Sequence, residues 1–324
     1  MTPRPHREPH PQPHARLRMG LDVGGTKIEG ALFGPDNEPL TRARIAAPRD
    51  DYAATLSAIA GLVSDLEAGL EPAVRGGVSI GIGVPGSISP FTGVMQNANS
   101  TWLNGRAFDS DLARSLTRPV RVANDANCFA LSEATDGAGA GSRSVFGVIL
   151  GTGCGGGLVL NGRLVDGGRG IGGEWGHNPL PWAVAEEHPG PLCWCGRNGC
   201  METWVSGPAL EADYRRAAAG RIPAEAIASL AVEGDKEAQA ALARHAGRLA
   251  RGLAHVVNII DPDAIVLGGG LSKLAHLYSV LPALMVPHIF ADDKRVRIVP
   301  PKWGDASGVR GAAWLWDESA IAFD

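Results

Sequence analysis

Three cysteines and one histidine have the types and spacing of a metal site. Cys193, Cys195 and Cys200 lie in "CWCGRNGC", and His177 ends "GEWGH", with fifteen residues between it and Cys193. One imidazole nitrogen and three thiolates complete a tetrahedral Zn²⁺ shell with no open position, the arrangement of a structural rather than a hydrolytic site. The residues alone leave a regulatory disulfide and ordinary buried thiols as alternatives.

Two glutamates flank this cluster. Glu174 lies three residues before His177, and Glu202 lies two residues after Cys200. If a metal ordered the intervening loop, both carboxylates could lie beside one cleft and accept hydrogen bonds from the hydroxyl groups of a ligand. The alternative is that both are solvated surface carboxylates.

A further carboxylate, Asp125, lies in "ANDAN" (123–127), between an apolar segment and a helical pattern. A carboxylate at a strand end could act as a general base. Spacing alone favours a helix cap or an Asx turn for Asn-Asp at this place. The residues therefore leave the catalytic interpretation open.

Two glycine-rich segments have the composition of anion-binding turns. They are "GLDVGGTKIEG" (20–30) and "GTGCGGG" (151–157), each at the end of an apolar strand pattern. Glycine lets backbone N–H groups approach a phosphate closely. Plain hairpins and bulges are the alternative for each segment. Neither segment matches the G-x-x-x-x-G-K-[ST] loop or the G-x-G-x-x-G dinucleotide motif.

The composition excludes several other classes of protein. The chain has 324 residues, 44% hydrophobic and 20% charged, which is enough for two domains with separate cores. A formal net charge of −4 provides no basic surface for nucleic acid. No apolar run approaches the roughly 20 residues that span a bilayer. Five cysteines, an odd number, argue against a secreted disulfide framework, so we expect a cytoplasmic protein without membrane partners.

Short apolar runs that end in turn residues alternate with helical patterns, which indicates an α/β fold. We expect strands at 19–25, 78–86, 120–127, 144–153, 157–163 and 264–270. We expect helices at 51–70, 107–116, 235–260 and 307–319. Residues 1–18, rich in Pro, His and Arg, are predicted to be a disordered extension.

The order of these motifs resembles the ROK family of sugar kinases and sugar-responsive repressors. The resemblance rests on "DVGGTK" (22–27), "ANDAN", "GTGCGGG", "GGEWGH" with "CWCGRNGC", and "LGGG" (267–270), and it extends from Met19 to Trp316. Within the family, "GVPGSISPFTGV" (83–94), "NANSTWLNG" (97–105) and "GEWGHNPLPW" (173–182) resemble the bacterial fructokinase, or mannofructokinase, branch.

This resemblance implies a two-lobed actin-like, hexokinase-type ATPase fold of duplicated RNase H-like domains, with a structural zinc knuckle. Residues 19–135 would form a small N-terminal lobe, completed by a C-terminal helix at 307–324. Residues 136–306 would form the large lobe with the ATP and zinc/sugar loops.

The resemblance also implies that the two glycine-rich loops face each other across a cleft and hold ATP with Mg²⁺, near the adenosine-binding "LGGG". The implied ATP-binding residues are Gly20, Asp22, Gly24, Gly25, Thr26, Lys27, Gly151, Thr152, Gly153, Gly155, Gly156, Gly268, Gly269 and Gly270.

The family's catalytic base corresponds to Asp125. The implied sugar-binding residues are Asn99, Asn124, Asp125, Glu174, His177 and Glu202, with Asn99 chosen over Asn97 and Asn104. His177 can serve both sugar and zinc because the two imidazole nitrogens can have different partners. The implied zinc ligands are His177, Cys193, Cys195 and Cys200.

The branch resemblance implies phosphorylation of D-fructose to fructose 6-phosphate, with mannose as a further substrate. The alternatives are a glucokinase, an N-acetylhexosamine kinase, or a sugar-sensing transcriptional regulator. Such regulators carry a helix-turn-helix before the "GGTK" loop, whereas here only 18 proline-rich residues precede the first strand. The acidic balance also argues against a zinc knuckle that binds nucleic acid. Homodimerisation is usual for the resembling kinases.

Overall fold

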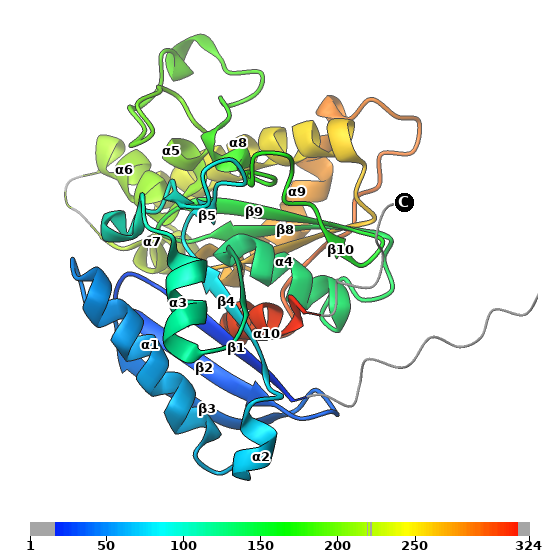
Figure 1. Cartoon of the computed structure of the whole chain (residues 1–324). Coiled ribbons are helices and arrows are strands. Elements are labelled where there is room, and N and C mark those ends of the chain that lie inside the picture. The colour runs from blue at the N-terminus through cyan, green and yellow to red at the C-terminus, as the bar shows by residue number, and fades with distance from the viewer. Residues whose placement is uncertain (1–16, 219, 221, 317–324) are drawn as a thin grey trace, which may run out of the picture.

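The computed structural model describes residues 17–218, 220 and 222–316, whose arrangement is shown in Figure 1. They form two five-stranded mixed sheets and one two-stranded sheet of β5 (Ser87–Ile88) and β6 (Met95–Gln96). Among the helices of this described part, none is both long and apolar enough to cross a membrane.

The first sheet has the strand order β3-β2-β1-β4-β7. β2 pairs antiparallel with β1 and β3, whereas β4 pairs in parallel with β1 and β7. The strands are β1 (Arg18–Val23), β2 (Lys27–Phe33), β3 (Pro39–Ala46), β4 (Ser79–Val84) and β7 (Val120–Asn124). β1 and β4 are buried on both faces, which explains why they read as continuous apolar runs.

The second sheet repeats this order as β10-β9-β8-β11-β12, with the same parallel and antiparallel pairs. Its strands are β8 (Ser144–Leu150), β9 (Cys154–Leu160), β10 (Arg163–Leu164), β11 (Ala264–Gly268) and β12 (Ile298–Val299). The repeat confirms the predicted duplicated α/β fold. In each sheet the first two strands form a hairpin, and its turn is one of the two glycine-rich segments.

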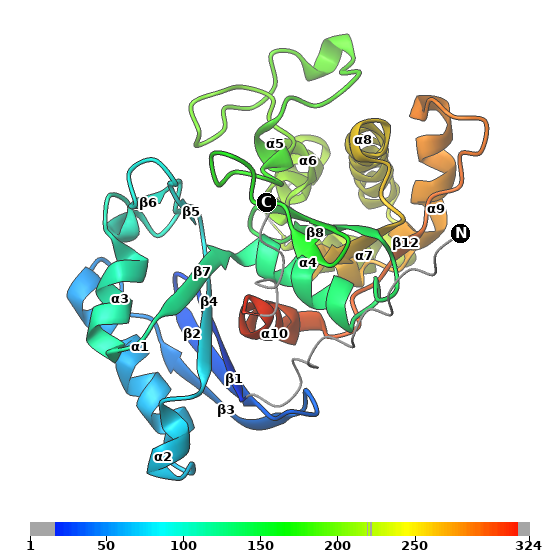
Figure 2. The same ribbon diagram turned by 45° about the vertical axis from the view of Figure 1, so that its right-hand side comes forward.

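The outer faces of the sheets are covered by amphipathic helices (Figures 1 and 2). The first sheet carries α1 (Tyr52–Glu67) and α3 (Phe108–Leu116), with the short α2 (Pro72–Arg75) after α1. The second sheet carries α6 (Gly207–Ala217), α7 (Ala224–Val232), α8 (Lys236–Ile260) and α9 (His276–Met285), preceded by α5 (Glu202–Val205). The 3₁₀ segments are η2 (Thr101–Leu103), η3 (Trp175–His177), η4 (Ala185–Glu187), η5 (Gly270–Lys273), η6 (Val286–His288) and η7 (Gly304–Ala306).

Side-chain caps determine where the two longest helices begin. Asp51 accepts a hydrogen bond from the backbone N–H of Ala54 at 2.9 Å, so α1 starts at the next residue, Tyr52. Asp235 caps α8 in the same way through the N–H of Ala238 at 2.7 Å. These caps explain why the predicted helices at 51–70 and 235–260 agree with the structure at their N-terminal ends.

Two helices lie between the sheets and join them. α10 (Ser307–Trp314) packs against β1, β4 and α4 (Asp125–Thr135), and α4 packs in turn on β8 and β9 (Figure 2). Glycine makes this contact possible: a β-carbon at Gly20 would lie 1.8 Å from the carbonyl oxygen of Val309. A β-carbon at Gly81 would lie equally close to the carbonyl oxygen of Ala312.

Several predicted boundaries differ from the structure. Arg18 is buried and begins β1, so the last residue of the predicted extension belongs to the first strand. Residues 1–16 lie outside the described residues. The strand predicted at 120–127 ends at Asn124, because α4 begins at the next residue. α10 ends at Trp314, and residues 317–324 of the predicted terminal helix lie outside the described part. The lobe boundary at 135 and 136 stays a prediction.

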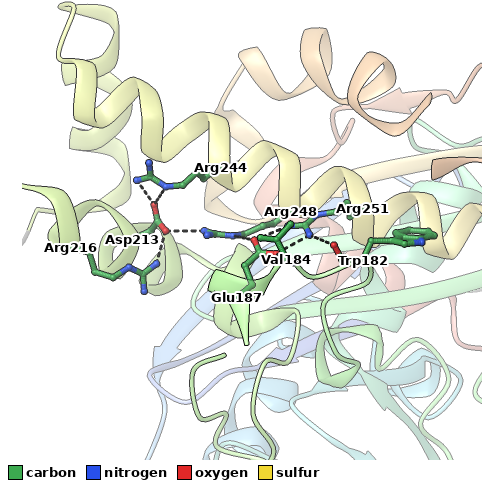
Figure 3. A network of polar contacts seen from close by, with 8 residues as sticks. All are labelled: Trp182, Val184, Glu187, Asp213, Arg216, Arg244, Arg248 and Arg251. Carbon is green, nitrogen blue, oxygen red and sulfur yellow. Dashed lines mark hydrogen bonds and ion pairs between the residues drawn. The ribbon is translucent and has the colours of Figure 1, made fainter. Parts of the chain in front are cut away.

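A buried network of ion pairs joins the segment before the cysteine cluster to α6 and α8 (Figure 3). Glu187 accepts hydrogen bonds from Arg248 Nε at 2.9 Å and from Arg251 Nη2 at 2.7 Å. Arg248 also donates to Asp213 on α6 at 2.9 Å, and Arg244 donates to the same carboxylate at 2.7 Å. Segment 182–187 is thereby held against α8.

We expect E187Q to lower the free energy of unfolding at pH 7 by about 3–5 kcal/mol, because the substitution removes the charged partner of Arg251 and one of the two charged partners of Arg248. Burial alone would raise the pKa of Glu187, but hydrogen bonds from Arg251 and Arg248 lower it to about 2. The stabilisation is therefore complete above the unfolded pKa and is lost as the pH falls toward 2.

Urea unfolding of E187Q and wild-type protein at several pH values measures this difference. The exposed neighbour Glu186 provides the control E186Q, which should stay within about 0.5 kcal/mol of wild type. Equal stability of E187Q and E186Q at pH 7 would contradict the prediction.

Candidate functional site

A cleft of about 320 Å³ brings together the six residues predicted to bind sugar and part of the second glycine-rich turn. Its lining comes from segment 85–99 and the start of α4, and from the β8–β9 hairpin, η3 and the cysteine cluster. The predicted site residues that line it are Asn99, Asn124, Asp125, Gly151, Thr152, Gly153, Gly155, Glu174, His177 and Glu202.

Asp125 is the first residue of α4, directly after β7. Its Oδ1 accepts the N–H of Ala126 at 2.8 Å. Burial raises the pKa of Asp125 to about 7, and the nearby carboxylates of Asp22 and Glu174 add to the increase, although the Ala126 N–H opposes it. A carboxylate with this pKa is a stronger base than an exposed aspartate and is still mostly ionised just above neutral pH.

Asn124, which lines the cleft, also caps α4. Its Oδ1 accepts the N–H groups of Ala126 and Asn127 at 2.9 and 3.4 Å, and its Nδ2 donates to the carbonyl oxygen of Gly86 at 3.2 Å. The side chain therefore ties α4 to the segment after β4, and its predicted contact with a sugar stays a prediction. The helix-cap interpretation of "ANDAN" applies to Asn124, and it leaves Asp125 turned toward the cleft.

The three asparagines of segment 97–105 separate into two groups. Asn97 and Asn99 both line the cleft. Asn104 instead clamps its own loop by hydrogen bonds with the backbone of Ala98, at 2.9 Å in both directions. Asn97 is a lining residue that the sequence analysis did not choose, and its spacing from Asn99 offered no signal to distinguish the two.

The cysteine cluster has the geometry of a metal site. The ligand atoms of His177, Cys193, Cys195 and Cys200 all lie within 4.8 Å of one another. His177 Nδ1 lies 3.5 Å from Cys193 Sγ, and Cys195 Sγ lies 3.6 Å from Cys200 Sγ. A disulfide needs about 2.05 Å between sulfurs, so this pair is not one, and the N and S donor set is that of zinc. Cys128 and Cys154 are buried outside the cluster.

Glu202 connects the cysteine cluster to the β8–β9 hairpin. Its Oε1 accepts the indole N–H of Trp194 at 2.8 Å, and its Oε2 accepts the backbone N–H of Cys154 at 3.1 Å. Glu174, at the start of η3, faces the same cleft, and burial raises its pKa. Trp194 was not predicted from the sequence as a site residue. Its position between Cys193 and Cys195 is the pattern that could have indicated it.

The two glycine-rich turns are not equivalent in the structure. Gly151, Thr152, Gly153 and Gly155 of the second turn line the cleft. The first turn is closed by a hydrogen bond from the N–H of Gly24 to the carbonyl oxygen of Lys27 at 2.9 Å. Within the described chain, the cleft lining includes none of Gly24, Gly25, Thr26 and Lys27.

Lys27 is the first residue of β2, and its Nζ lies 3.6 Å from the carboxylate of Glu29. Asp22 lies on β1, just before the first turn. Burial raises the pKa of Asp22 despite the opposing charge of Lys27. Asp22 is also close enough to Asp125 to raise the pKa of that residue.

A second cavity, of about 340 Å³, adjoins the cleft at Gly151 and Thr152 and is also lined by Gly270. Other predicted ATP-binding glycines are packing positions. A β-carbon at Gly268 would lie 2.5 Å from the Phe129 ring, and one at Gly156 would lie 2.6 Å from the Trp175 ring. Gly269 has φ +78° against the backbone of Leu150, and Gly20 contacts α10. At these positions glycine allows neighbouring segments to pack closely.

Comparison with known proteins places the chain among sugar kinases. Residues 18–319 match the sequence profile of the ROK family. The N-acetyl-D-glucosamine kinase of Pectobacterium atrosepticum is 39% identical over 303 residues, which are 92% of this chain and 98% of that protein. The N-acetyl-D-glucosamine kinase of Vibrio cholerae is also 39% identical, over 92% of this chain and 99% of its own.

Two solved structures have a similar fold. The ROK hexokinase of Thermus thermophilus superposes with a TM-score of 0.79 at 29% identity, covering 94% of this chain and all of that one. A ROK glucokinase from Streptomyces griseus, in complex with glucose and AMPPNP, has a TM-score of 0.74 at 26% identity, covering 92% of this chain and 98% of its own.

We expect the purified protein to contain about one zinc ion per chain, because the three sulfurs and one nitrogen form a closed tetrahedral set. C195S removes one thiolate and should lose most of the zinc, whereas C128S changes a buried cysteine in α4 outside the cluster and should keep it. Elemental analysis by mass spectrometry measures both. Equal zinc in C195S and C128S would contradict the assignment.

Proposed function

The chain belongs to the ROK family, and we propose that it is an ATP-dependent hexose kinase whose substrate is N-acetyl-D-glucosamine. The observation that carries this proposal is the single cleft that joins Asp125 to Glu174, His177 and Glu202. The adjoining cavity at Gly151 and Thr152 offers space for a nucleotide directly beside these groups. A hydroxyl bound among the carboxylates would therefore face both a base and a phosphoryl donor.

The charge of the cleft supports a neutral substrate. Asp125, Glu174 and Glu202 face it, and among the described residues that line it there is neither lysine nor arginine. Carboxylates accept hydrogen bonds from sugar hydroxyls but repel an anionic group, such as the carboxylate of a sugar acid or the phosphate of a sugar phosphate. A neutral sugar suits this arrangement.

The choice of sugar departs from the resemblance to the fructokinase branch. The two N-acetyl-D-glucosamine kinases, each 39% identical over nearly their whole length, support the N-acetylhexosamine alternative over D-fructose. Fructose stays the second candidate because segment 173–182, which carries Glu174 and His177 into the cleft, has the pattern of that branch.

In the proposed mechanism, Asp125 accepts the proton of the sugar 6-hydroxyl as that oxygen attacks the γ-phosphorus of ATP. The new oxygen–phosphorus bond forms while the bond to the β-phosphate oxygen breaks, and ADP leaves. Loose phosphoryl-transfer transition states need alignment and charge neutralisation more than covalent assistance from the protein. ATP would enter with Mg²⁺, and we assign Asp22, close enough to Asp125 to raise its pKa, a supporting role near this metal and the phosphates.

Zinc in this proposal supplies a fixed point for the loop and no chemistry, because its four protein ligands leave no open position. His177 Nδ1 faces Cys193, so the other ring nitrogen is free to donate to the sugar. Both carboxylate oxygens of Glu202 accept hydrogen bonds, from Trp194 and from Cys154, which fixes the orientation of its remaining lone pairs. Homodimerisation and cytoplasmic location stay predictions from the sequence.

Among N-acetyl-D-glucosamine, D-glucose, D-mannose and D-fructose, we expect N-acetyl-D-glucosamine to have the highest kcat/KM with Mg-ATP. A site that binds one polar substituent rejects sugars without it, because its polar groups are then left unpaired. ADP release measured in a coupled assay ranks the four sugars. If fructose ranks first, the kinase assignment holds and the sugar assignment is wrong; if no sugar releases ADP, the kinase proposal is wrong.

We expect D125N to reduce kcat by at least about 10²-fold, because general base catalysis is worth roughly 10²–10⁴-fold. The base must be ionised, and the pKa of Asp125 is raised to about 7, so wild-type kcat/KM should fall as the pH drops below about 7. D125N should unfold at no lower temperature than wild type at pH 8, because it removes a charge that burial disfavours.

Glu133, at the other end of α4, is fully buried, so a variant at that position is not a suitable control. The comparison variant is D22N, which changes the carboxylate that neighbours Asp125. D22N should lower the pKa of Asp125 and shift the acidic limb of the profile to lower pH. A D125N protein with wild-type turnover would overturn the assignment of the base.

A further inference from the structure

Trp194 is an exposed aromatic residue at the edge of the sugar cleft. Its side chain is 59% exposed, and it lines the cleft together with Glu174, His177 and Glu202. It lies between Cys193 and Cys195, two ligands of the metal cluster. Isolated exposed apolar side chains are common on protein surfaces, but Trp194 lines a cleft that can hold a ligand.

The indole N–H of Trp194 has a defined partner. It donates to Glu202 Oε1 at 2.8 Å, and the other carboxylate oxygen of Glu202 accepts the N–H of Cys154 at 3.1 Å. Two donors on different oxygens prevent the carboxylate from rotating, so Glu202 presents its free lone pairs in one orientation. Hydrogen bonds to a charged group are stronger than those between neutral groups.

The ring of Trp194 also contacts the second sugar-facing group. It meets the His177 imidazole edge to face, with 5.0 Å between the ring centroids and 86° between the planes. His177 has one nitrogen toward Cys193, so the indole limits how the rest of the imidazole can tilt within the cleft. One side chain therefore touches both Glu202 and His177.

We propose that Trp194 is the positioning residue of the sugar site: its N–H orients Glu202 and its ring forms an apolar wall for the sugar. The inference rests on the proposed hexose kinase function and extends it. Because Cys193 and Cys195 anchor the backbone on both sides, Trp194 transfers the fixed geometry of the metal cluster to the carboxylate. The exposed ring area is available to the C–H face of a neutral sugar or to an N-acetyl methyl group.

Trp182 provides a matched control. It is 50% exposed, comparable to Trp194, but its ring stacks on His288 with 4.9 Å between centroids, and it does not line the cleft. Its interaction with Arg251 uses the backbone carbonyl oxygen, which a side-chain substitution leaves in place. W182F therefore makes the same chemical change at an exposed tryptophan outside the sugar site.

The experiment compares W194F, W194A and W182F with the wild-type zinc-loaded protein. Calorimetry measures the Kd of N-acetyl-D-glucosamine, D-glucose, D-mannose and D-fructose without ATP, and steady-state assays measure kcat and both KM values. W194F keeps a ring but loses the donor. We expect it to raise the Kd and KM of the preferred sugar about tenfold or more, with kcat and the ATP KM within about threefold.

W194A removes the ring as well and should weaken sugar binding about threefold further, while W182F should match wild type. Zinc content should be unchanged in all variants. A sugar Kd for W194F within about twofold of wild type would overturn the proposal, as would loss of zinc together with sugar affinity, which indicates a purely structural role. If W194A binds sugar as well as W194F does, the ring has no part in binding.

Failure of the proposed function has a separate signature. If the wild-type protein binds none of the four sugars, the hexose kinase assignment fails, and the role of Trp194 fails with it. If wild type binds and phosphorylates a sugar but W194F does so equally well, only the inference about Trp194 is wrong.

Discussion

The whole structure depends on a contact between backbones at its centre. α10 reaches β1 and β4 at Gly20 and Gly81, and Gly311 on α10 meets α4, where a β-carbon would lie 1.7 Å from the carbonyl oxygen of Cys128. Any side chain at these three positions would push the layers apart. Because Asp125 is the first residue of α4, the depth of this packing decides how far the carboxylate stands from the β8–β9 turn.

Duplication of the sheet created two similar hairpins that now differ in use. Each turn is closed by a backbone hydrogen bond of its own, from the N–H of Gly24 to the carbonyl oxygen of Lys27 in the first and from the N–H of Gly151 to the carbonyl oxygen of Gly153 in the second. The β8–β9 turn is also bonded to the helices that follow it, since Glu202 accepts the N–H of Cys154 and the carbonyl oxygen of Gly151 accepts the N–H of Gly207. This second turn thus keeps its position through α5 and α6 and remains beside the cleft that holds Asp125.

Asp125, Asp22 and Glu174 are buried close to one another, which is electrostatically unfavourable and therefore points to a function. Asp22 and Glu174 both raise the pKa of Asp125, and burial raises the pKa of all three. A fold selected for stability alone would place such groups in water or beside arginines, as it does with Glu187 and Asp213. The contrast between these two clusters within one protein supports the proposed role of the first as a sugar site.

The α/β class, the N-terminal ends of α1 and α8, and the set of three Cys and one His could be predicted from the sequence, because they depend on local periodicity and spacing. The tertiary structure was needed to show that Asn124 rather than Asp125 caps α4, that Asn104 clamps its loop, and that Gly20, Gly156, Gly268 and Gly269 are closely packed. It also decided that Trp194 holds Glu202. A residue type states which bonds a side chain can make, but its partner is set by segments that lie far away in the chain.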